Sequence, residues 1–280
     1  MSGSRTTLAG RLARMGFADA ARAERLLLTD LGGTAEDLTT DAVLTALAAA
    51  ADPDLALTGL ARVFGAAKDR LELRQALHDE PEFRDRLTAV LGVSAGLADH
   101  LTRHPEDGRV LRGTVSRPGP AELREHLLRA VGANPRLSEP VAGQEPGRAR
   151  SDHVAALAAA YRRRLLHLAA RDLTGVATVD EVVEELADIA AAVLEAALAV
   201  ARCELPPGSA PCRLAVVAMG KCGARELNYA SDVDVIFVAE PAGNGQSDGD
   251  ETVALATASR LAAGVIGVCA RSTPEGSIFP

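Results

Sequence analysis

The chain has 280 residues, a formal net charge of −8 at pH 7 and an aromatic content of only 2%. This length suffices for one large domain or two smaller domains with a buried core. An acidic balance with few aromatic side chains offers neither a basic groove nor platforms on which bases could stack, so we expect no nucleic acid as a substrate.

The sequence also predicts a cytoplasmic protein without a membrane partner. The apolar stretch 189–201 contains Glu195 and is shorter than the ~20 residues that a spanning helix needs. The run 253–270 contains Arg260. No apolar signal core follows the arginines of the amino terminus, so we expect no export. The four cysteines lack the paired spacing of metal ligands, and we expect reduced, partly buried thiols.

Helices are predicted through the first three quarters of the chain, because leucine and alanine recur there every three or four residues. The predicted helices are 5–29, 41–50, 54–77, 81–91, 93–103, 120–131, 151–171 and 179–204. Two segments that are rich in glycine, proline and arginine, 105–120 and 132–151, are predicted to be loops.

A break at Leu205-Pro206-Pro207-Gly208 separates this helical region from a region that contains strands. Apolar runs predict strands at 213–219 and 233–239, followed by a helix at 250–266 and an unfinished terminal segment. The predicted fold class is therefore α+β. A mainly helical lead-in region at 1–208 would precede a partial sheet-containing core at 209–280.

The segment that joins the two predicted strands carries the clearest chemical signal. The apolar run 214–219 of the first predicted strand is followed by Gly220, where backbone amides can approach an oxyanion closely because no side chain intervenes. Lys221 and Arg225 add positive charge beside it. This turn therefore indicates phosphate binding.

Two aspartates open the second predicted strand. Successive side chains of a strand point to opposite faces, so Asp232 and Asp234 would share one face and stand ~7 Å apart. Such a pair can hold Mg²⁺, which takes one or two carboxylates and completes its shell with water and substrate phosphates. An isolated Asp-x-Asp is more often a solvated strand edge, but the preceding Gly-Lys turn favours a metal and phosphate site here.

Two other phosphate-binding loops do not fit the sequence. A Walker loop requires Lys-Ser or Lys-Thr, whereas Cys222 and Gly223 follow Lys221. A dinucleotide fingerprint requires three glycines in a fixed frame, and this turn has two.

The run GKCGARELNY from Gly220 to Tyr229, followed by Ser-Asp-Val-Asp at 231–234, resembles the glutamine synthetase adenylyltransferase and adenylyl-removing enzyme family. Moderately specific similarities to the helical lead-in of that family lie at 91–94, 97–101, 103–106, 161–166 and 169–173. The resemblance covers about residues 60–280. It implies a DNA polymerase beta-like nucleotidyltransferase core at 209–280, in the position of the first of two such domains, which is the adenylyl-removing one.

The resemblance also implies an activity. Magnesium-dependent phosphorolysis would remove an adenylyl group from a tyrosine of glutamine synthetase and give ADP, and the complete enzyme would also adenylylate that tyrosine from ATP. Asp232 and Asp234 would be the catalytic and metal-binding residues. The residues that bind phosphate and nucleotide would be Gly220, Lys221, Arg225 and Ser231. The implied partners are adenylylated glutamine synthetase and a PII signalling protein.

The sequence departs from the family at two places. Ala224 stands where the family often has a glycine, which is a mild change within a helical turn. Superfamily members also need a third carboxylate, which in this family follows a Glu-Gly segment, and the sequence ends just past Glu275-Gly276. We therefore expect the front part of a longer enzyme with two of its three metal ligands. The other acids after Asp234 are Glu240, Asp248, Asp250, Glu251 and Glu275.

Two other functions stay open at this point. A nucleotidyltransferase that acts on a small molecule would use the same pair of aspartates. A catalytically incomplete docking or regulatory fragment would bind glutamine synthetase equally well without them.

Three further features are predicted to be structural. His100 and His104 lie four residues apart on a predicted helix and are expected to form a surface pair rather than a metal site. The arginines at 162–164 are expected to be a solvated face, with contact to a partner protein as the alternative. Cys222 is expected to fill space rather than to act as a catalytic thiol.

Overall fold

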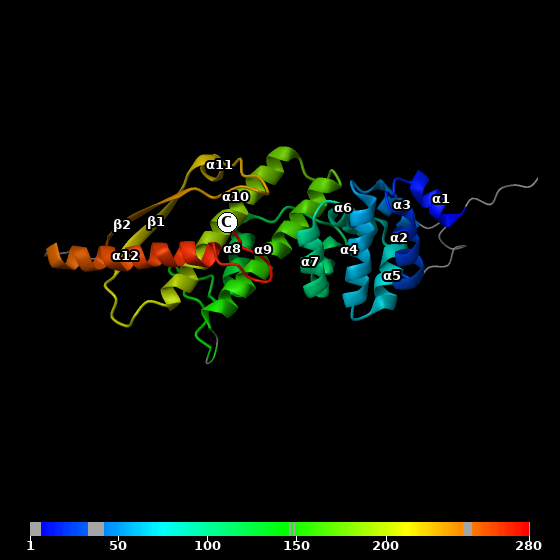
Figure 1. Cartoon of the computed structure of the whole chain (residues 1–280). Coiled ribbons are helices and arrows are strands. Elements are labelled where there is room, and N and C mark those ends of the chain that lie inside the picture. The colour runs from blue at the N-terminus through cyan, green and yellow to red at the C-terminus, as the bar shows by residue number, and fades with distance from the viewer. Residues whose placement is uncertain (1–6, 33–41, 146, 148, 243–247, 280) are drawn as a thin grey trace, which may run out of the picture. The chain divides into compact units, whose positions relative to one another are not determined.

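The computed structural model describes residues 7–32, 42–145, 147, 149–242 and 248–279 (Figure 1). The chain divides into two compact units. The first comprises Met1–Ser116 and Leu165–Ala177, and the second comprises Arg117–Arg164 and Thr178–Pro280. The predicted boundary at residue 208 does not separate these units, because the long helix that precedes it packs with the strand region.

Among its described residues, the first unit contains helices and no strand. Its elements are α1 (Leu8–Arg14), α2 (Ala20–Arg25), a π-helical turn η1 (Leu26–Asp30), α3 (Ala42–Ala49), α4 (Pro53–Ala66), α5 (Arg70–Asp79), α6 (Pro81–Leu91), α7 (Ala95–Arg103), the 3₁₀ helix η3 (Pro105–Leu111) and the end of α9 (Arg150–Leu173). Helix α4 packs against α6 and α7. Leu57 and Leu60 of α4 are at most 1% exposed, as are Leu91 and Leu101 of its neighbours. The predicted loop 105–120 thus begins with a 3₁₀ helix.

Two helices that we predicted as continuous are broken in the structure. In place of 5–29, α1 ends near Gly16, whose φ is +98°, and Asp19 caps the start of α2. In place of 54–77, α4 ends at Ala66, and Asp69 caps α5 by accepting a hydrogen bond from its first turn. The apolar period continues across both breaks, so only the caps mark them.

The second unit combines helices with a β-hairpin. Its elements are α8 (Pro120–Ala130), the first part of α9, α10 (Val179–Cys203), β1 (Cys212–Ala218), α11 (Gly220–Gly223), β2 (Val235–Pro241) and α12 (Asp248–Cys269). Thr178 and Glu181 form a capping box that starts α10. Helix α10 contacts α8 and α12. A Cβ at Gly264 of α12 would lie 2.7 Å from the Cβ of Ala201 in α10, so this close approach depends on glycine.

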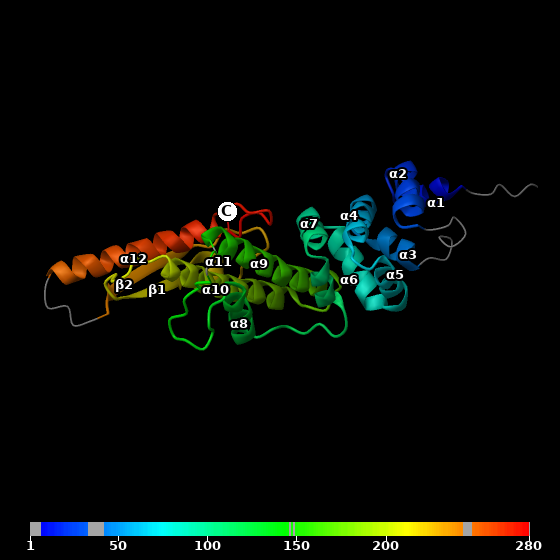
Figure 2. The same cartoon turned by 90° about the horizontal axis from the view of Figure 1, so that it is seen from below.

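The hairpin is a two-stranded antiparallel sheet with one covered face. Arg213 pairs with Glu240 and Val217 with Ile236 in its register. Helix α12 contacts both strands and runs alongside them in both views (Figures 1 and 2). Val217, Ile236 and Val238 on the other face are 43%, 50% and 55% exposed. A mostly helical chain with a small sheet agrees with the predicted α+β class.

Helix α12 contains most of the apolar run 253–270. Among the described residues, one segment, Glu251–Cys269, is long and apolar enough to cross a membrane by length and composition. The helix contacts α10 and both strands, and its Ala258, Leu261 and Val265 are buried. One face of the helix therefore packs within the second unit, whereas Val253 and Ile266 are 55% and 56% exposed.

The histidine pair differs from its prediction. His100 is fully buried, and its Nε2 lies 3.0 Å from Oδ2 of Asp107. The ring centroids of His100 and His104 are 4.9 Å apart. The expectation of a surface pair was wrong for His100, because α7 packs against η3 and buries that face.

The arginines at 162–164 also do not form a solvated face. The Nε of Arg162 donates to the carbonyl of Glu275 at 3.0 Å, and the Nε of Arg164 donates to Nδ1 of His126 at 3.1 Å. Both arginine side chains are half-buried. Their guanidinium groups tie α9 to other segments of the second unit.

Candidate functional site

The Gly-Lys turn follows β1 directly and forms the single helical turn α11. Gly220 has a φ of +51°, and a Cβ built on it would lie 2.9 Å from Oδ2 of Asp234. A Cβ built on Gly223 would lie 2.4 Å from the carbonyl oxygen of Ala218. Gly223 requires glycine because a side chain would collide with the backbone. At Gly220 the positive φ disfavours any other residue, and a side chain would also displace the carboxylate of Asp234. Ala224 closes the turn in a right-handed helical conformation, which alanine adopts readily.

The contact at Gly220 also places the carboxylate of Asp234 against the backbone of the turn. The amide of Met219 donates to the carbonyl of Asp234 at 2.8 Å and so extends the strand pairing by one step. Strand β2 begins only at Val235, two residues later than the predicted start. The alternation of exposed and half-buried side chains nevertheless runs from Ser231 through β2. Asp232 and Asp234 are both on its exposed side.

The polar groups around these aspartates have few partners within the protein. Lys221 is exposed and forms no hydrogen bond or ion pair with the residues that the structure describes. The hydroxyl of Ser231 lies 3.5 Å from Oδ1 of Asp232. The two carboxylates and the ammonium group are therefore accessible to a ligand from solvent.

Arg225 lies in the same turn but points to a different partner. Its guanidinium forms two bonds with the carboxylate of Asp188 on α10, from Nη1 to Oδ1 at 2.9 Å and from Nη2 to Oδ2 at 3.1 Å. The hydrogen bond to Asp188 raises the pKa of Arg225. Arg225 therefore anchors the turn to α10, whereas the resemblance implies a phosphate ligand.

The backbone of Arg225 adds to this anchoring role. Its φ is +60°, and it is the one described residue other than glycine with a positive φ. The left-handed conformation costs an L-residue ~1–2 kcal/mol, so the ion pair with Asp188 holds a strained turn in place.

Sequence reasoning missed Asp188 and its second partner. The side chain of Asp188 is only 5% exposed, and it also accepts a hydrogen bond from Arg117 at 3.3 Å. Arg117 in turn bonds Glu184 at 2.9 Å, and this hydrogen bond raises the pKa of Arg117. The sequence did contain a signal for this pair, because Asp188 stands between apolar residues of α10. An acid in that position is buried, and a buried charge requires a partner.

The remaining acids do not complete a set of three carboxylates. Glu240 bonds Arg213 at 3.0 Å near the far end of β2, and Glu275 is buried. Asp248, Asp250 and Glu251 belong to the first turn of α12. Among the described residues, no contact joins a third carboxylate to Asp232 and Asp234.

Cys222 behaves as expected for a residue that fills space. It is buried beneath the turn, and burial raises the pKa of its thiol. A raised pKa favours the unreactive thiol over the nucleophilic thiolate.

The donor set at the turn fits a hard divalent cation. Asp232 and Asp234 offer carboxylate oxygens, the ligands that Mg²⁺ prefers, and both side chains are exposed and form no ion pair with the described residues. A site with few protein ligands leaves room for water and phosphate oxygens around the ion.

Comparisons with known proteins show the family to which this chain belongs. The family model described as "Glutamate-ammonia ligase adenylyltransferase" matches residues 84–280. The bifunctional glutamine synthetase adenylyltransferase/adenylyl-removing enzyme of Streptomyces coelicolor is 46% identical over 282 residues, which cover 99% of this chain and 26% of the relative. The enzyme of the same name from Streptomyces avermitilis is 46% identical over 285 residues, with the same shares covered. That from Cutibacterium acnes is 43% identical over 232 residues, 81% of this chain and 22% of the relative.

These similarities extend through the helical first unit and the hairpin alike. The chain spans about a quarter of the length of the two Streptomyces relatives. The family match includes the Gly-Lys turn, both aspartates and the helices α7 to α12. The chain belongs to the glutamate-ammonia ligase adenylyltransferase family.

Proposed function

We propose that this chain carries the site that removes adenylyl groups from a tyrosine of glutamine synthetase. The observation that carries the proposal is the contact between Gly220 and the Asp234 carboxylate. It brings a turn suited to phosphate and a pair of carboxylates suited to magnesium to one end of the hairpin. The names of the relatives, which include adenylyl-removing enzymes, support the substrate.

The proposed reaction is phosphorolysis. An oxygen of inorganic phosphate attacks the phosphorus of the adenylyl group, and a new P–O bond forms as the bond to the tyrosine oxygen breaks. The tyrosine oxygen takes up the proton that the hydrogen phosphate loses, and the products are tyrosine and ADP.

The residues of the turn would bind and orient the reacting groups. Asp232 and Asp234 would hold Mg²⁺, which neutralises charge on phosphoryl oxygens and aligns attacking and leaving oxygens when it is bound. Lys221 would donate to oxygens of the phosphate, and the absence of a partner for it among the residues that the structure describes supports this role. The amide of Gly220 and the hydroxyl of Ser231 would complete the set of donors.

Further partners belong to the same proposal. ATP would be the substrate for adenylylation by the whole protein, and a PII signalling protein would regulate the balance between the two reactions. A cytoplasmic location would give the enzyme access to glutamine synthetase.

Manganese binding tests the metal site directly. We would titrate the 280-residue chain with Mn²⁺ and follow the free ion by electron paramagnetic resonance. Asp232→Asn and Asp234→Asn should each weaken binding at least about tenfold, because each removes a ligand charge without a large change in shape. Glu240→Gln is the matched control, since Glu240 is an exposed acid of β2, which follows the two aspartates, and it pairs with Arg213. Unchanged binding in both aspartate variants would refute the site.

A transfer assay separates this function from its rival. Adenylylated glutamine synthetase with phosphate should give ADP, whereas ATP with small hydroxyl acceptors should give no adenylylated product. Transfer to a small acceptor, without release of ADP from the protein substrate, would favour a nucleotidyltransferase of small molecules.

A further inference from the structure

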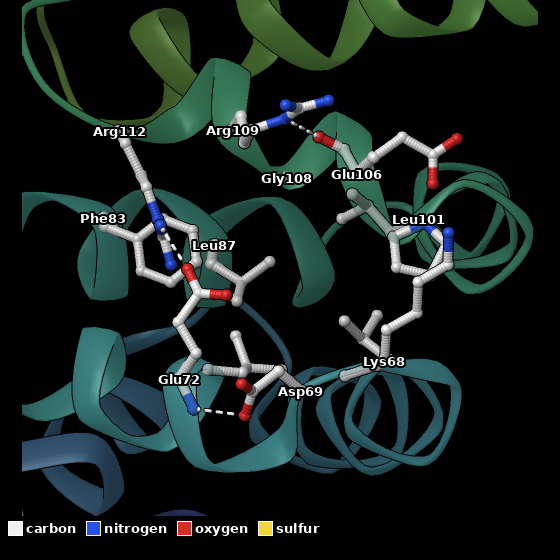
Figure 3. A pocket seen from close by; sticks show the side chains of 14 residues that line it. Lys68, Asp69, Glu72, Phe83, Leu87, Leu101, Glu106, Gly108, Arg109 and Arg112 are labelled. Atoms are coloured by element: carbon white, nitrogen blue, oxygen red, sulfur yellow. Dashed lines mark hydrogen bonds and ion pairs between the residues drawn. The ribbon is translucent and has the colours of Figure 1, made fainter.

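A pocket in the first unit has the features of a second ligand site. Its volume is about 320 Å³, and it lies among the connection between α4 and α5, helices α6 and α7, and η3 (Figure 3). Four apolar residues of its lining, Val63, Phe83, Leu87 and Leu101, are at most 5% exposed. An apolar lining of this size can bury the body of a small molecule.

One wall of the pocket is held by contacts within the protein. The guanidinium of Arg112 lies 5.0 Å from the centre of the Phe83 ring, and its Nη1 bonds Oε1 of Glu72 at 2.8 Å. Asp69 accepts a hydrogen bond from the amide of Glu72 at 2.9 Å as the cap of α5. Figure 3 shows both bonds as dashed lines. The charges of this wall already have partners.

Two other cations of the lining have no such partner. Lys68 lies in the connection between α4 and α5, and Arg109 lies in η3 on the opposite side of the view in Figure 3. Neither forms an ion pair with any residue in the described part of the chain. The Nε of Arg109 donates to the carbonyl of Glu106 at 3.0 Å, which orients the side chain and leaves its terminal nitrogens for another acceptor. The carboxylate of Glu106 lies 3.8 Å from Nδ1 of His104.

We propose that this pocket binds a small organic anion with a carboxylate between Lys68 and Arg109. The apolar body of the anion would lie on the four buried apolar residues of the lining, which form the floor of the pocket. Lys68 and Arg109 are exposed, so water solvates both when the pocket holds a neutral apolar molecule, whereas a carboxylate would pair with them. Inorganic phosphate would leave the buried apolar residues of the lining without a partner. The buried apolar floor and the two cations together favour a ligand that has both an apolar body and a carboxylate. The pocket belongs to the first unit and the Gly-Lys turn to the second, so binding here does not depend on the proposed reaction.

Two variants separate the floor from the charges. Gly108 lines the pocket, and a Cβ there would meet only Cδ2 of Leu101, at the ordinary contact distance of 4.0 Å. Gly108→Leu therefore adds volume beside the floor without a backbone clash. The double variant Lys68→Gln with Arg109→Gln keeps the volume and removes the charge. Arg22→Gln, at an exposed position of α2 outside the lining, is the matched control.

Three probes that share a phenyl ring test the proposal by nuclear magnetic resonance titration of the 280-residue chain. Benzoate should shift the amide signals of Lys68, Gly108 and Arg109, and should bind at least about fivefold more tightly than benzyl alcohol or benzylamine. The double glutamine variant should bind benzoate no better than benzyl alcohol. Gly108→Leu should abolish the shifts, and Arg22→Gln should leave them unchanged.

The opposite results overturn the proposal. Equal affinity for the three probes, or full benzoate binding by the double glutamine variant, would show that Lys68 and Arg109 do not recognise the carboxylate. Shifts that persist in Gly108→Leu would place binding outside the pocket. Inorganic phosphate that binds as tightly as benzoate would show an anion site without a role for the floor. Circular dichroism of each variant confirms that it is folded.

Discussion

Replacing Asp188 by asparagine should loosen the turn that carries the candidate site. The substitution removes the charge that receives three bonds, two from Arg225 and one from Arg117. Breaking a fully buried ion pair costs ~3–5 kcal/mol. The arginine side chains are 50% and 28% exposed and can regain water, so we expect a smaller cost of ~2 kcal/mol here.

Hydrogen exchange measures this effect where it occurs. A local cost of ~2 kcal/mol corresponds to ~30-fold faster exchange of the amides of residues 219–228. Peptides from the first unit should exchange as before, which provides an internal control. Arg213→Ala is the matched control variant, because it breaks the exposed pair with Glu240 and should change little. Unchanged exchange at 219–228 in Asp188→Asn would refute the anchoring role of Arg225.

The strained backbone at Arg225 allows a second check of the same reasoning. Arg225→Ala loses the ion pair and keeps an L-residue at a φ of +60°, whereas Arg225→Gly loses the ion pair and relieves the strain. The free energy of local opening at 219–228 should therefore be about 1 kcal/mol lower in the alanine variant, so these amides should exchange faster than in the glycine variant. Slower exchange with alanine than with glycine would show that the turn is not strained.

Three other outcomes follow from contacts of the second unit. Gly220→Ala should destabilise the turn by ~1–2 kcal/mol and weaken Mn²⁺ binding, because the new Cβ would lie 2.9 Å from Oδ2 of Asp234. Mn²⁺ binding at full strength in this variant would contradict the prediction. Burial raises the pKa of Cys269 from 9.0 to about 12, so iodoacetamide at pH 8 should label this thiol only after unfolding. The contribution of Cys269 to stability should fall as the pH rises from 9 to 12, because the unfolded thiol loses its proton first. Arg162→Ala removes donors to two carbonyls of the segment 273–279, so limited proteolysis should cut there sooner than in the unmodified chain.

The local features of the fold followed from the sequence because they depend on neighbouring residues. Apolar periodicity predicted the ends of α10 and β1 to within a residue or two. The absence of a side chain at Gly220 predicted that another group can approach its backbone closely. Alternation along a strand also predicted that Asp232 and Asp234 share one face. The sequence did not predict that the carboxylate of Asp234 lies beside Gly220, where we expected an oxyanion of a ligand.

The errors arose where tertiary packing decides the structure. The break at Asp69 interrupts an apolar period that continues on both sides, so periodicity alone predicted one helix. His100 is polar and was placed on the surface, but Asp107 satisfies its ring nitrogen in a buried position. The assignment of Arg225 to phosphate stays a prediction, but the sequence analysis did not identify the bond of its guanidinium to Asp188 on α10.

The release of ADP tests the central claim most directly. The 280-residue chain would be incubated with adenylylated glutamine synthetase, inorganic phosphate and Mg²⁺, beside its Asp232→Asn and Glu240→Gln variants, and ADP would be measured by chromatography. We predict phosphate-dependent ADP from the unmodified chain and from Glu240→Gln, and none from Asp232→Asn. That result would show that Asp232 and Asp234 suffice without a third carboxylate beside them. Equal ADP from the Asp232→Asn variant, or no ADP from any of the three, would contradict the assignment of this reaction to the residues of the chain.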